Sequence, residues 1–376
     1  MKQVLLILSF LPCLLSAQSS IYTNDMDYVL GDVKQAFIQD KISNPTQVQM
    51  LLEGFKAMQV NGIRVPIITD AEVPNEQALS YFCKQAVEAG FKIFANPAQS
   101  SGGQRLACEV LDSEGLVSVY DDDDATQTLI DRILDFESQI ECTWICPFNE
   151  DGKAGAAFSA SQMNTIFSTL AASDMDAELI GPCVWGIPAS IQVLQNTDIK
   201  NYIGIATTHN LGFNHDSWPD FIAEAESKNL PVWDSEVNHT RKYEDEMTRL
   251  EAALYYEVDG LVLYNSWNFI AYNGDGSINS TAQTWMSLYL KPTAIQAVED
   301  ESDLFDVYSG ASSFTISLME PFIPNDITVL DMNGRVIRQL TSNGVQDLEV
   351  DDLRPGVYVL VLSAAGELQR EKVVVY

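Results

Sequence analysis

The sequence predicts an α/β fold, a (β/α)8 TIM barrel followed by a small all-β sandwich domain. Strand-like and helix-like segments alternate eight times over about 270 residues, the usual size of such a barrel. Polar residues recur where the strands end, and no glycine-rich phosphate loop follows the first strand. Both features disfavour the rival fold, a doubly wound open sheet. After Pro292 the composition changes to short strands separated by turns.

The predicted barrel strands are short apolar runs bounded by turn residues. They span residues 28–33, 63–68, 91–96, 142–148, 177–185, 202–209, 230–237 and 261–267. The fourth run leads directly into Asn149 and Glu150, and the seventh carries Glu236 near its end. Because the carboxyl ends of parallel strands meet at one face of a barrel, we expect these polar residues to lie together.

The predicted helices have apolar residues at helical spacing. In the first of them Val48, Leu51 and Phe55 lie on one face, and Asn61-Gly62 ends the segment. The helical segments span residues 47–59, 75–89, 126–140, 161–172, 188–194, 218–228, 244–257 and 282–290. Residues 22–37, which contain the first strand, are expected to be extended.

The charge balance limits the partners of this chain. It has 53 acidic and 21 basic residues, a formal net charge of -32, and 46% hydrophobic residues. The hydrophobic content predicts a substantial core. Because contacts with phosphate use Lys or Arg, the charge argues against binding to nucleic acid or to anionic membrane surfaces. The acidity either keeps a secreted protein soluble or favours neutral and cationic substrates over sulfated ones.

The N-terminal residues predict a secretory signal peptide over residues 1–17. Lys2 precedes an apolar run from Val4 to Leu15, and Ala17 is a small residue at the expected cleavage point. The mature chain should therefore work outside the cytoplasm, secreted or at the cell surface. Cys13 lacks the flanking residues of a lipoprotein cleavage site. No other stretch has the roughly 18 apolar residues that a membrane span needs.

Cysteine and histidine spacing predicts no metal centre. Five cysteines remain in the mature chain, and the sequence does not choose among pairings, although a bond between Cys83 and Cys108 is one option. The three histidines do not complete a zinc-ligand spacing, so we expect no catalytic metal and no cofactor. The acidic run Asp121–Asp124 is expected to be a solvated loop, with a calcium loop as the alternative.

Glu150 and Glu236 are the candidate catalytic residues. Each follows or ends a buried strand, and 86 residues separate them, which fits three intervening βα units. Two strand-end carboxylates are the minimum equipment for hydrolysing a glycosidic bond. The alternative is that both are surface carboxylates in loops.

The C-terminal segment predicts a small antiparallel sandwich, since short apolar runs alternate with turn pairs such as Asn333-Gly334 and Pro355-Gly356. The order of Asn333-Gly334-Arg335 and of residues 353–358 (LRPGVY) resembles the C-terminal sorting domain of the type IX secretion system of Bacteroidetes. The resemblance implies export across the outer membrane with the type IX machinery as a partner, and then cleavage or surface attachment. A carbohydrate-binding sandwich is the alternative.

The barrel resembles the clan A glycoside hydrolases, which include families 5, 30, 39 and 128. The resemblance rests on four segments, at residues 62–67 (GIRVPI), 149–150 (NE), 235–236 (SE) and 265–267 (NSW). It implies that Glu150 is the acid/base, Glu236 the nucleophile, and Arg64 a residue that steadies the nucleophile. One departure is Asp151, which stands where families 5, 30 and 128 usually have Pro.

Six residues are the predicted substrate-binding set: Arg64, Asn96, Asn149, Trp185, His209 and Trp267. The Asn149 amide can donate to a sugar 2-hydroxyl, a contact that strengthens in the transition state. The resemblance implies that Trp267 forms the floor of the sugar site. His209, at the end of the sixth strand, is expected to contact the acid/base or the substrate. The alternatives are ordinary: Arg64 pairing with an acidic neighbour, both tryptophans packed in the core, and His209 as a satisfied polar residue.

The predicted organisation is a signal peptide (1–17), a glycoside hydrolase barrel (18–292), a linker (293–305) and a sorting domain (306–376). The predicted function is retaining hydrolysis of a β-linked polysaccharide (β-glucan, mannan or algal galactan) by a monomeric secreted enzyme. The apparent lack of bulky inserted domains favours endo action. The alternatives are an exo-acting β-glycosidase and a carbohydrate-binding surface protein without turnover.

Overall fold

The computed structural model describes residues 20–68, 76–110, 116–151 and 157–291, together with seven stretches of the C-terminal segment. Those stretches are 305–309, 313–318, 326–331, 336–341, 347–353, 356–364 and 367–375. The chain divides into two compact units, residues 1–292 and residues 293–376. The predicted signal peptide lies outside the described residues, as does the predicted linker apart from Phe305, where a strand begins.

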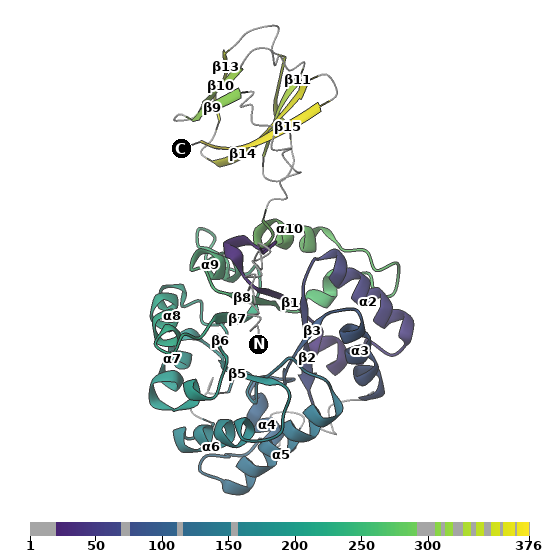
Figure 1. Ribbon diagram of the computed structural model, residues 1–376, viewed down its shortest axis with the longest axis vertical. Helices are drawn as coiled ribbons and strands as arrows, with labels where there is room; N and C mark the ends of the chain where they lie inside the picture. Colours follow the sequence, from purple (N-terminus) through teal and green to yellow (C-terminus); the bar gives the residue numbers. More distant parts are fainter. Residues whose placement is uncertain are drawn as a thin grey trace, which may run out of the picture. The chain divides into compact units, whose positions relative to one another are not determined.

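The first unit contains a closed barrel of eight parallel strands, as the sequence predicts (Figure 1). The strands are β1 (Tyr28–Asp32), β2 (Gly62–Ile67), β3 (Lys92–Pro97), β4 (Trp144–Ile145), β5 (Glu178–Val184), β6 (Ile205–Thr208), β7 (Val232–Val237) and β8 (Gly260–Leu263). The barrel closes where β8 pairs with β1, with Leu30 opposite Val262. All eight carboxyl ends therefore meet at one face, where Glu150 and Glu236 follow or end their strands.

Helices surround the strands in an outer ring (Figure 1). They are α1 (Lys34–Ile38), α2 (Pro45–Ala57), α3 (Glu76–Glu88), α4 (Gly102–Cys108), α5 (Asp123–Gln139), α6 (Ala160–Ala171), α7 (Ile187–Asn196), α8 (Trp218–Glu226), α9 (Arg249–Tyr255) and α10 (Ser280–Tyr289). Short 3-10 helices lie at Thr23–Asp25 (η1), Ile199–Asn201 (η2), His215–Ser217 (η3) and Ser266–Phe269 (η4). Capping boxes at Ser159 and Thr248 fix where α6 and α9 begin.

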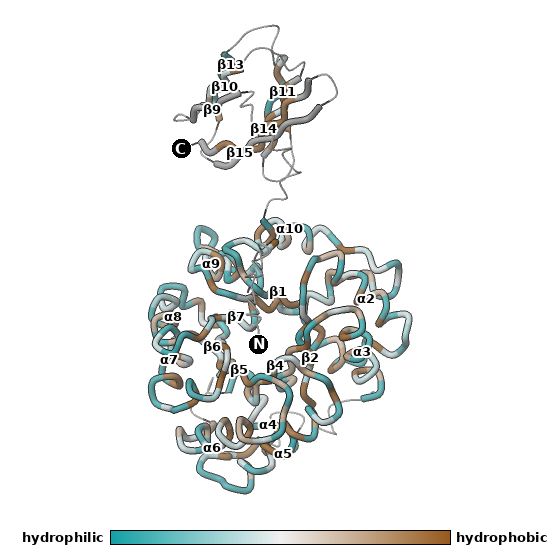
Figure 2. Tube along the Cα trace, viewed as in Figure 1, coloured by the Kyte–Doolittle hydropathy of each residue, from teal (hydrophilic) through white to brown (hydrophobic). Residues whose placement is uncertain are grey.

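Large side chains fill the end of the barrel where the strands begin. The rings of Tyr28, Trp144 and Trp233 contact one another with centroids 4.7 to 5.5 Å apart, although they come from the non-adjacent strands β1, β4 and β7. Gly260 completes this layer, since a Cβ there would lie 2.4 Å from the Trp233 indole nitrogen. Figure 2 shows hydrophobic residues along barrel strands such as β1. This packed end leaves the opposite face for chemistry.

The second unit is a pair of small antiparallel sheets, consistent with the predicted sandwich. One sheet has the order β13-β10-β9 and the other β12-β11-β14-β15. The strands are β9 (Phe305–Ser309), β10 (Phe314–Leu318), β11 (Asp326–Asp331), β12 (Val336–Leu340), β13 (Asp347–Val350), β14 (Gly356–Ala364) and β15 (Glu367–Val375). A buried cluster that includes Ile316, Val329 and Leu360 forms their own core.

The structure corrects four local predictions. Residues 34–38 form α1 rather than extended chain, and α4 was not predicted, because its Gly-Gly start hides the helical pattern. The predicted helix at 244–257 is shorter, since Thr248 caps α9. The acidic run is not a loop throughout, because the Asp122 side chain caps α5. Asp123 and Asp124 lie in the first turn of that helix, where the helix dipole favours negative charge.

The cysteines are free thiols in the described residues, so Cys83 and Cys108 are not bonded. Cys83 and Cys142 are buried, and burial raises the pKa of the Cys83 thiol to about 12. Among the described helices, none has the length and apolar character needed to cross a membrane.

Candidate active site

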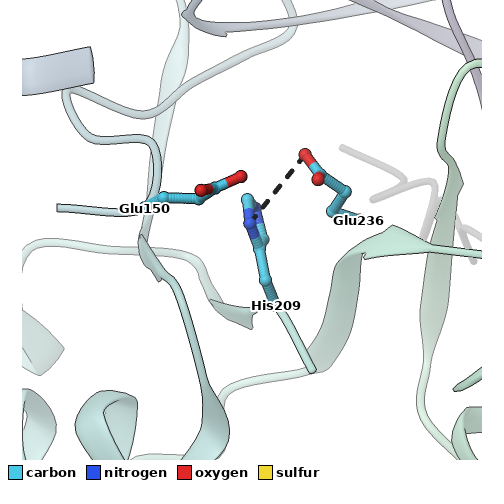
Figure 3. A group of neighbouring side chains, drawn as sticks. All are labelled: Glu150, His209 and Glu236. Carbon is cyan, nitrogen blue, oxygen red and sulfur yellow. Dashed lines mark ion pairs between the residues drawn. The ribbon is translucent and has the colours of Figure 1, made fainter. Parts of the chain in front are cut away.

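Glu150 and Glu236 lie close together at the carboxyl ends of the barrel strands, with His209 between them (Figure 3). Donor atoms of the three side chains, one from each, all lie within 4.8 Å of one another. Glu236 belongs to β7 and is almost fully buried, whereas Glu150 follows β4 in a loop and is partly exposed. The Glu150 backbone has a φ of 58°, and its N–H donates to the Cys183 carbonyl at 2.8 Å.

Arg64 links Glu236 to the first strand of the barrel. Its guanidinium makes two bonds to the Asp32 carboxylate, at 3.0 and 2.9 Å, and one of 2.9 Å to Oε2 of Glu236. A further bond to the Ser235 carbonyl, also 2.9 Å, fixes the backbone beside Glu236. All these groups are buried, so the guanidinium has a rigid position.

The surroundings of Glu236 favour its ionised form. Burial acts to raise the pKa of this carboxyl, but His209, Arg64 and Lys34 together lower it from 4.5 to about 2. The carboxyl is therefore ionised at any pH at which the protein is expected to work. Asp234, two residues earlier, accepts the Glu236 N–H at 3.1 Å, and burial raises the pKa of Asp234 to about 6.

Lys34 is a buried cation next to Asn149. Its ammonium donates to Oδ1 of Asn149 at 2.8 Å, to the Pro97 carbonyl at 3.0 Å and to Oδ1 of Asn96 at 3.2 Å. Burial lowers the pKa of Lys34 to about 8, and Arg64 adds to this effect. Three oxygen acceptors compensate for burying the ammonium. The bond from Lys34 in turn holds the side-chain amide of Asn149 in one orientation.

The structure brings the predicted Asn96 and Asn149 together. The Asn96 amide donates to Oδ1 of Asn149 at 2.9 Å, so that oxygen accepts from both Asn96 and Lys34. The Nδ2 of Asn149 donates to the Gln99 carbonyl at 2.8 Å. Both asparagines are buried, and their side chains hydrogen-bond to each other and to Lys34.

Asp151, which departs from the family pattern, anchors the Glu150 loop. Its buried carboxylate accepts three backbone N–H groups, from Gly103 at 2.9 Å, Gln104 at 2.9 Å and Asn149 at 3.0 Å. The N–H groups of Gly103 and Gln104 lie in the first turn of α4, where they have no acceptor within the helix. Burial raises the pKa of Asp151 to about 6, although the three N–H groups act to lower it.

The imidazole ring of His209, unlike its backbone, makes no hydrogen bond among the described residues. Its ring is fully buried, neither nitrogen has a partner among the described residues, and Nδ1 lies 3.9 Å from Oε2 of Glu236. A buried polar nitrogen left unpaired costs about 1–3 kcal/mol. A bound group that occupied the space between Glu150 and Glu236 would remove that cost.

The aromatic predictions fall in different settings. Trp267, in η4, is 4% exposed and donates to Oδ1 of Asn265 at 3.2 Å, so it is mostly packed against the protein. Trp185 follows β5 and is partly exposed. Tyr264, not predicted, is partly exposed near Arg64, whose Cζ lies 6.0 Å from its ring centre. Burial, with Glu236 adding, raises the pKa of Tyr264, which keeps its hydroxyl a donor.

Asp32 and Lys34 were not predicted as site residues, and no role was predicted for Asp151. Asp32 and Lys34 flank the end of the first strand, and their position after a buried apolar run was the available signal. The contact of Asp151 with α4 had no such signal, because α4 itself was not predicted.

The C-terminal segment can be compared with known families. Residues 310–376 match the secretion system C-terminal sorting domain. This segment is a type IX sorting domain. It indicates that the chain is secreted, to the cell surface or beyond it. No curated protein sequence matches the chain.

Several solved glycoside hydrolases have similar structures. A GH30 endoxylanase from Clostridium papyrosolvens C71 has a TM-score of 0.50 and 12% identity, over 93% of this chain and 94% of its own. An endo-β-1,6-glucanase has a TM-score of 0.49 and 12% identity, over 93% and 88%. A Cellulomonas fimi endo-β-1,4-mannanase double mutant has a TM-score of 0.46 and 10% identity, over 94% and 95%. The likeness to the endoxylanase shows that this barrel is a fold that glycoside hydrolases use.

Proposed function

We propose that the barrel is a retaining glycoside hydrolase that cleaves a β-linked polysaccharide outside the cell. The observation that carries this proposal is the pair formed by Glu150 and Glu236, whose carboxylates approach within 4.8 Å with His209 between them. In retaining enzymes the two carboxyl groups are about 5–5.5 Å apart, whereas inverting enzymes leave about 6.5–9.5 Å for a water. The spacing here favours the retaining arrangement.

The proposed reaction has two steps. In the first, the Glu236 carboxylate attacks the anomeric carbon while Glu150 gives its proton to the leaving oxygen, and a covalent glycosyl ester forms on Glu236. In the second, Glu150 takes a proton from water, the oxygen of that water attacks the same carbon, and Glu236 is released as a carboxylate. The contacts of Arg64 with Glu236 support its role as the nucleophile, because they hold it ionised and in place.

The residues around Glu150 act on the acid/base through its neighbours. Lys34 and Asn96 fix the Asn149 amide, and Asp151 fixes the backbone on the other side. These are positioning residues in the proposal, since their hydrogen bonds hold Asn149 and the loop next to Glu150 and do not involve the Glu150 carboxylate. Trp185, Trp267 and Tyr264 are the side chains proposed to contact the sugar. Endo action is part of the proposal because the sequence shows no bulky inserted domain that would close one end of the cleft.

A screen of purified polysaccharides for new reducing ends tests the activity, and chromatography of the products separates endo from exo action. The Glu236→Ala variant should lose hydrolysis, and added azide should restore turnover as a glycosyl azide of inverted configuration. The matched control is Glu246→Ala, at an exposed position. Normal hydrolysis by Glu236→Ala would refute the assignment. Binding of a polysaccharide by the wild-type chain with no cleavage at all would favour the non-catalytic alternative.

A further inference from the structure

We propose that Glu150, His209 and Glu236 also form a reversible binding site for a divalent transition metal such as Zn²⁺, and that the bound metal excludes the substrate. Exclusion of the substrate rests on the proposed function, because it requires that the sugar occupies the space between the two carboxylates. Metal binding itself needs only the three side chains.

The donor atoms are close to a metal-binding geometry. One atom from each side chain lies within 4.8 Å of the other two, and Nδ1 of His209 is 3.9 Å from Oε2 of Glu236. Three atoms at that spacing lie within about 2.8 Å of a common centre, whereas Zn–N and Zn–O bonds are about 2.0–2.2 Å. Shifts of less than about 1 Å in each side chain would therefore close the site.

The unpaired ring nitrogens of His209 indicate a ligand in this site. It is fully buried, both ring nitrogens lack a hydrogen-bond partner among the described residues, and Figure 3 shows the ring between the two carboxylates. Neutral imidazole with a free lone pair is the commonest metal ligand in proteins. Two neighbouring side chains differ from His209 in this respect, because Lys34 donates to Asn149 and Arg64 donates to Glu236.

The free acceptors of the site complete the donor set. Arg64 donates one bond to Oε2 of Glu236, the oxygen that lies 3.9 Å from Nδ1 of His209, and a carboxylate oxygen has a second lone pair for a metal. Within the described part of the chain, neither Oε1 of Glu236 nor the Glu150 carboxylate has a hydrogen-bond partner. Lys34 directs its bonds to neutral oxygens, and Asp32 takes two of the bonds of Arg64. A donor set of one nitrogen and two carboxylates suits Zn²⁺ or Cu²⁺ better than Ca²⁺, which takes six to eight oxygens.

Metal binding would inhibit rather than assist hydrolysis. Coordination needs both carboxylates ionised, so the proton that Glu150 would give to the leaving oxygen is released to solvent when the metal binds. The metal would also occupy the lone pairs with which Glu236 attacks the anomeric carbon. Sugar and metal therefore compete for one space and for the same atoms.

The first test is titration of the metal-free full-length protein with Zn²⁺ alone, followed by calorimetry at neutral pH. We expect one equivalent to bind at this site, and its affinity to fall at least 10-fold in His209→Asn and in Glu150→Gln. Glu150 lies in a partly exposed loop, so its variant keeps the test informative if the buried His209→Asn variant does not fold. Ca²⁺ should not displace the Zn²⁺.

The matched control is His239→Asn. His239 is partly exposed with Nε2 3.7 Å from Oε1 of Glu251, so it offers Zn²⁺ a second imidazole beside a carboxylate, away from the proposed site. Affinity unchanged in His239→Asn and lost in the two site variants supports the site. No binding to the wild type, or binding unaffected by His209→Asn and Glu150→Gln, overturns it and leaves the proposed hydrolase untouched.

The second test uses a polysaccharide that the wild-type chain cleaves. Zn²⁺ should raise the apparent KM without changing kcat, and a chelator should restore the original rate. Binding of Zn²⁺ at the site with no effect on hydrolysis would overturn the exclusion. If no polysaccharide is cleaved, the proposed function fails, and the calorimetric result alone decides whether the metal site exists.

Discussion

The ammonium of Lys34 lies 2.8 Å from the side-chain oxygen of Asn149, the residue that precedes the candidate acid/base. The two residues are 115 positions apart in the chain, and both are buried. A cation from the start of α1 thus holds the end of the fourth strand, and it does so through a neutral amide. The candidate acid is positioned by a network that reaches across the barrel.

Replacing Lys34 by Met should lower kcat/KM by about 10²-fold, because the Asn149 amide loses a donor and Glu150 its fixed neighbour. Lys34→Arg keeps the charge but not the fit, and should recover only part of the activity. Steady-state kinetics of both variants measure this. A purely structural role would instead lower the melting temperature of Lys34→Met and leave the kcat of the folded fraction unchanged.

Replacing Arg64 by Met should move the acid limb of the kcat/KM profile to higher pH. Arg64 is among the groups that lower the pKa of Glu236 to about 2, so ionised Glu236 persists in the wild type until the pH falls through that value. Without the guanidinium the carboxyl protonates at higher pH, and activity is lost earlier on acidification. A pH–rate series measures the limb, and an unmoved limb in Arg64→Met would contradict the link.

The lowered pKa of Glu236 also predicts how the free energy of unfolding changes with pH. The pKa of Glu236 is lower in the folded chain than its ordinary 4.5, so its contribution is fully present above about pH 4.5 and is lost as the pH falls toward 2. The difference in free energy of unfolding between wild type and Glu236→Gln should therefore shrink across that window. Denaturant titrations at several pH values measure it; a constant difference would argue against a depressed pKa.

Replacing Asp151 by Ala should destabilise the barrel by about 3 kcal/mol, because three backbone N–H groups lose a charged acceptor in a buried place. The expected loss of activity exceeds what unfolding explains, since the Glu150 loop loses its anchor. Thermal melts and kinetics on the folded fraction separate the two effects. Asp351→Ala, at an exposed position of the second unit, is the matched control.

Replacing Gly103 by Ala should also disturb this loop. A Cβ at Gly103 would lie 2.6 Å from the Phe148 ring and 3.0 Å from the Pro147 carbonyl. Relieving such overlap typically costs about 1–3 kcal/mol. At Gly274 a Cβ would have its nearest neighbour at 3.4 Å, so Gly274→Ala should be neutral. Equal stability of the two variants would show that α4 can move away without cost.

Deleting residues 310–376 should stop secretion, because this segment matches the sorting domain. The shortened protein should collect inside the outer membrane of a native host, whereas the full chain reaches the cell surface or the medium. Fractionation followed by immunoblotting measures this distribution. Secretion of the shortened chain at the normal level would contradict the role of the segment.

Much of the fold could be predicted from the sequence because it depends on local patterns. Apolar runs of strand length and helical spacing gave the eight βα units in order, and the structure confirms the closed barrel and its small antiparallel companion. Errors arose where a cap or glycines set the boundary: Thr248 shortens α9, and Gly102-Gly103 hides α4. Such boundaries depend on single side-chain contacts that a periodicity does not record.

The sequence predicts that Glu150 and Glu236 follow or end barrel strands and that Arg64 belongs to the second strand, and these strands meet because parallel strands close into a barrel. The hydrogen-bond partners of these residues depend on how distant segments pack in the folded chain. The contacts of Lys34 with Asn149, of Asp151 with the start of α4, and of Arg64 with Asp32 join positions 115, 48 and 32 residues apart. The unpaired state of the His209 ring was decided in the same way. Hydrogen bonds depend on distances of a few tenths of an ångström between such segments, and no local pattern in the chain encodes them.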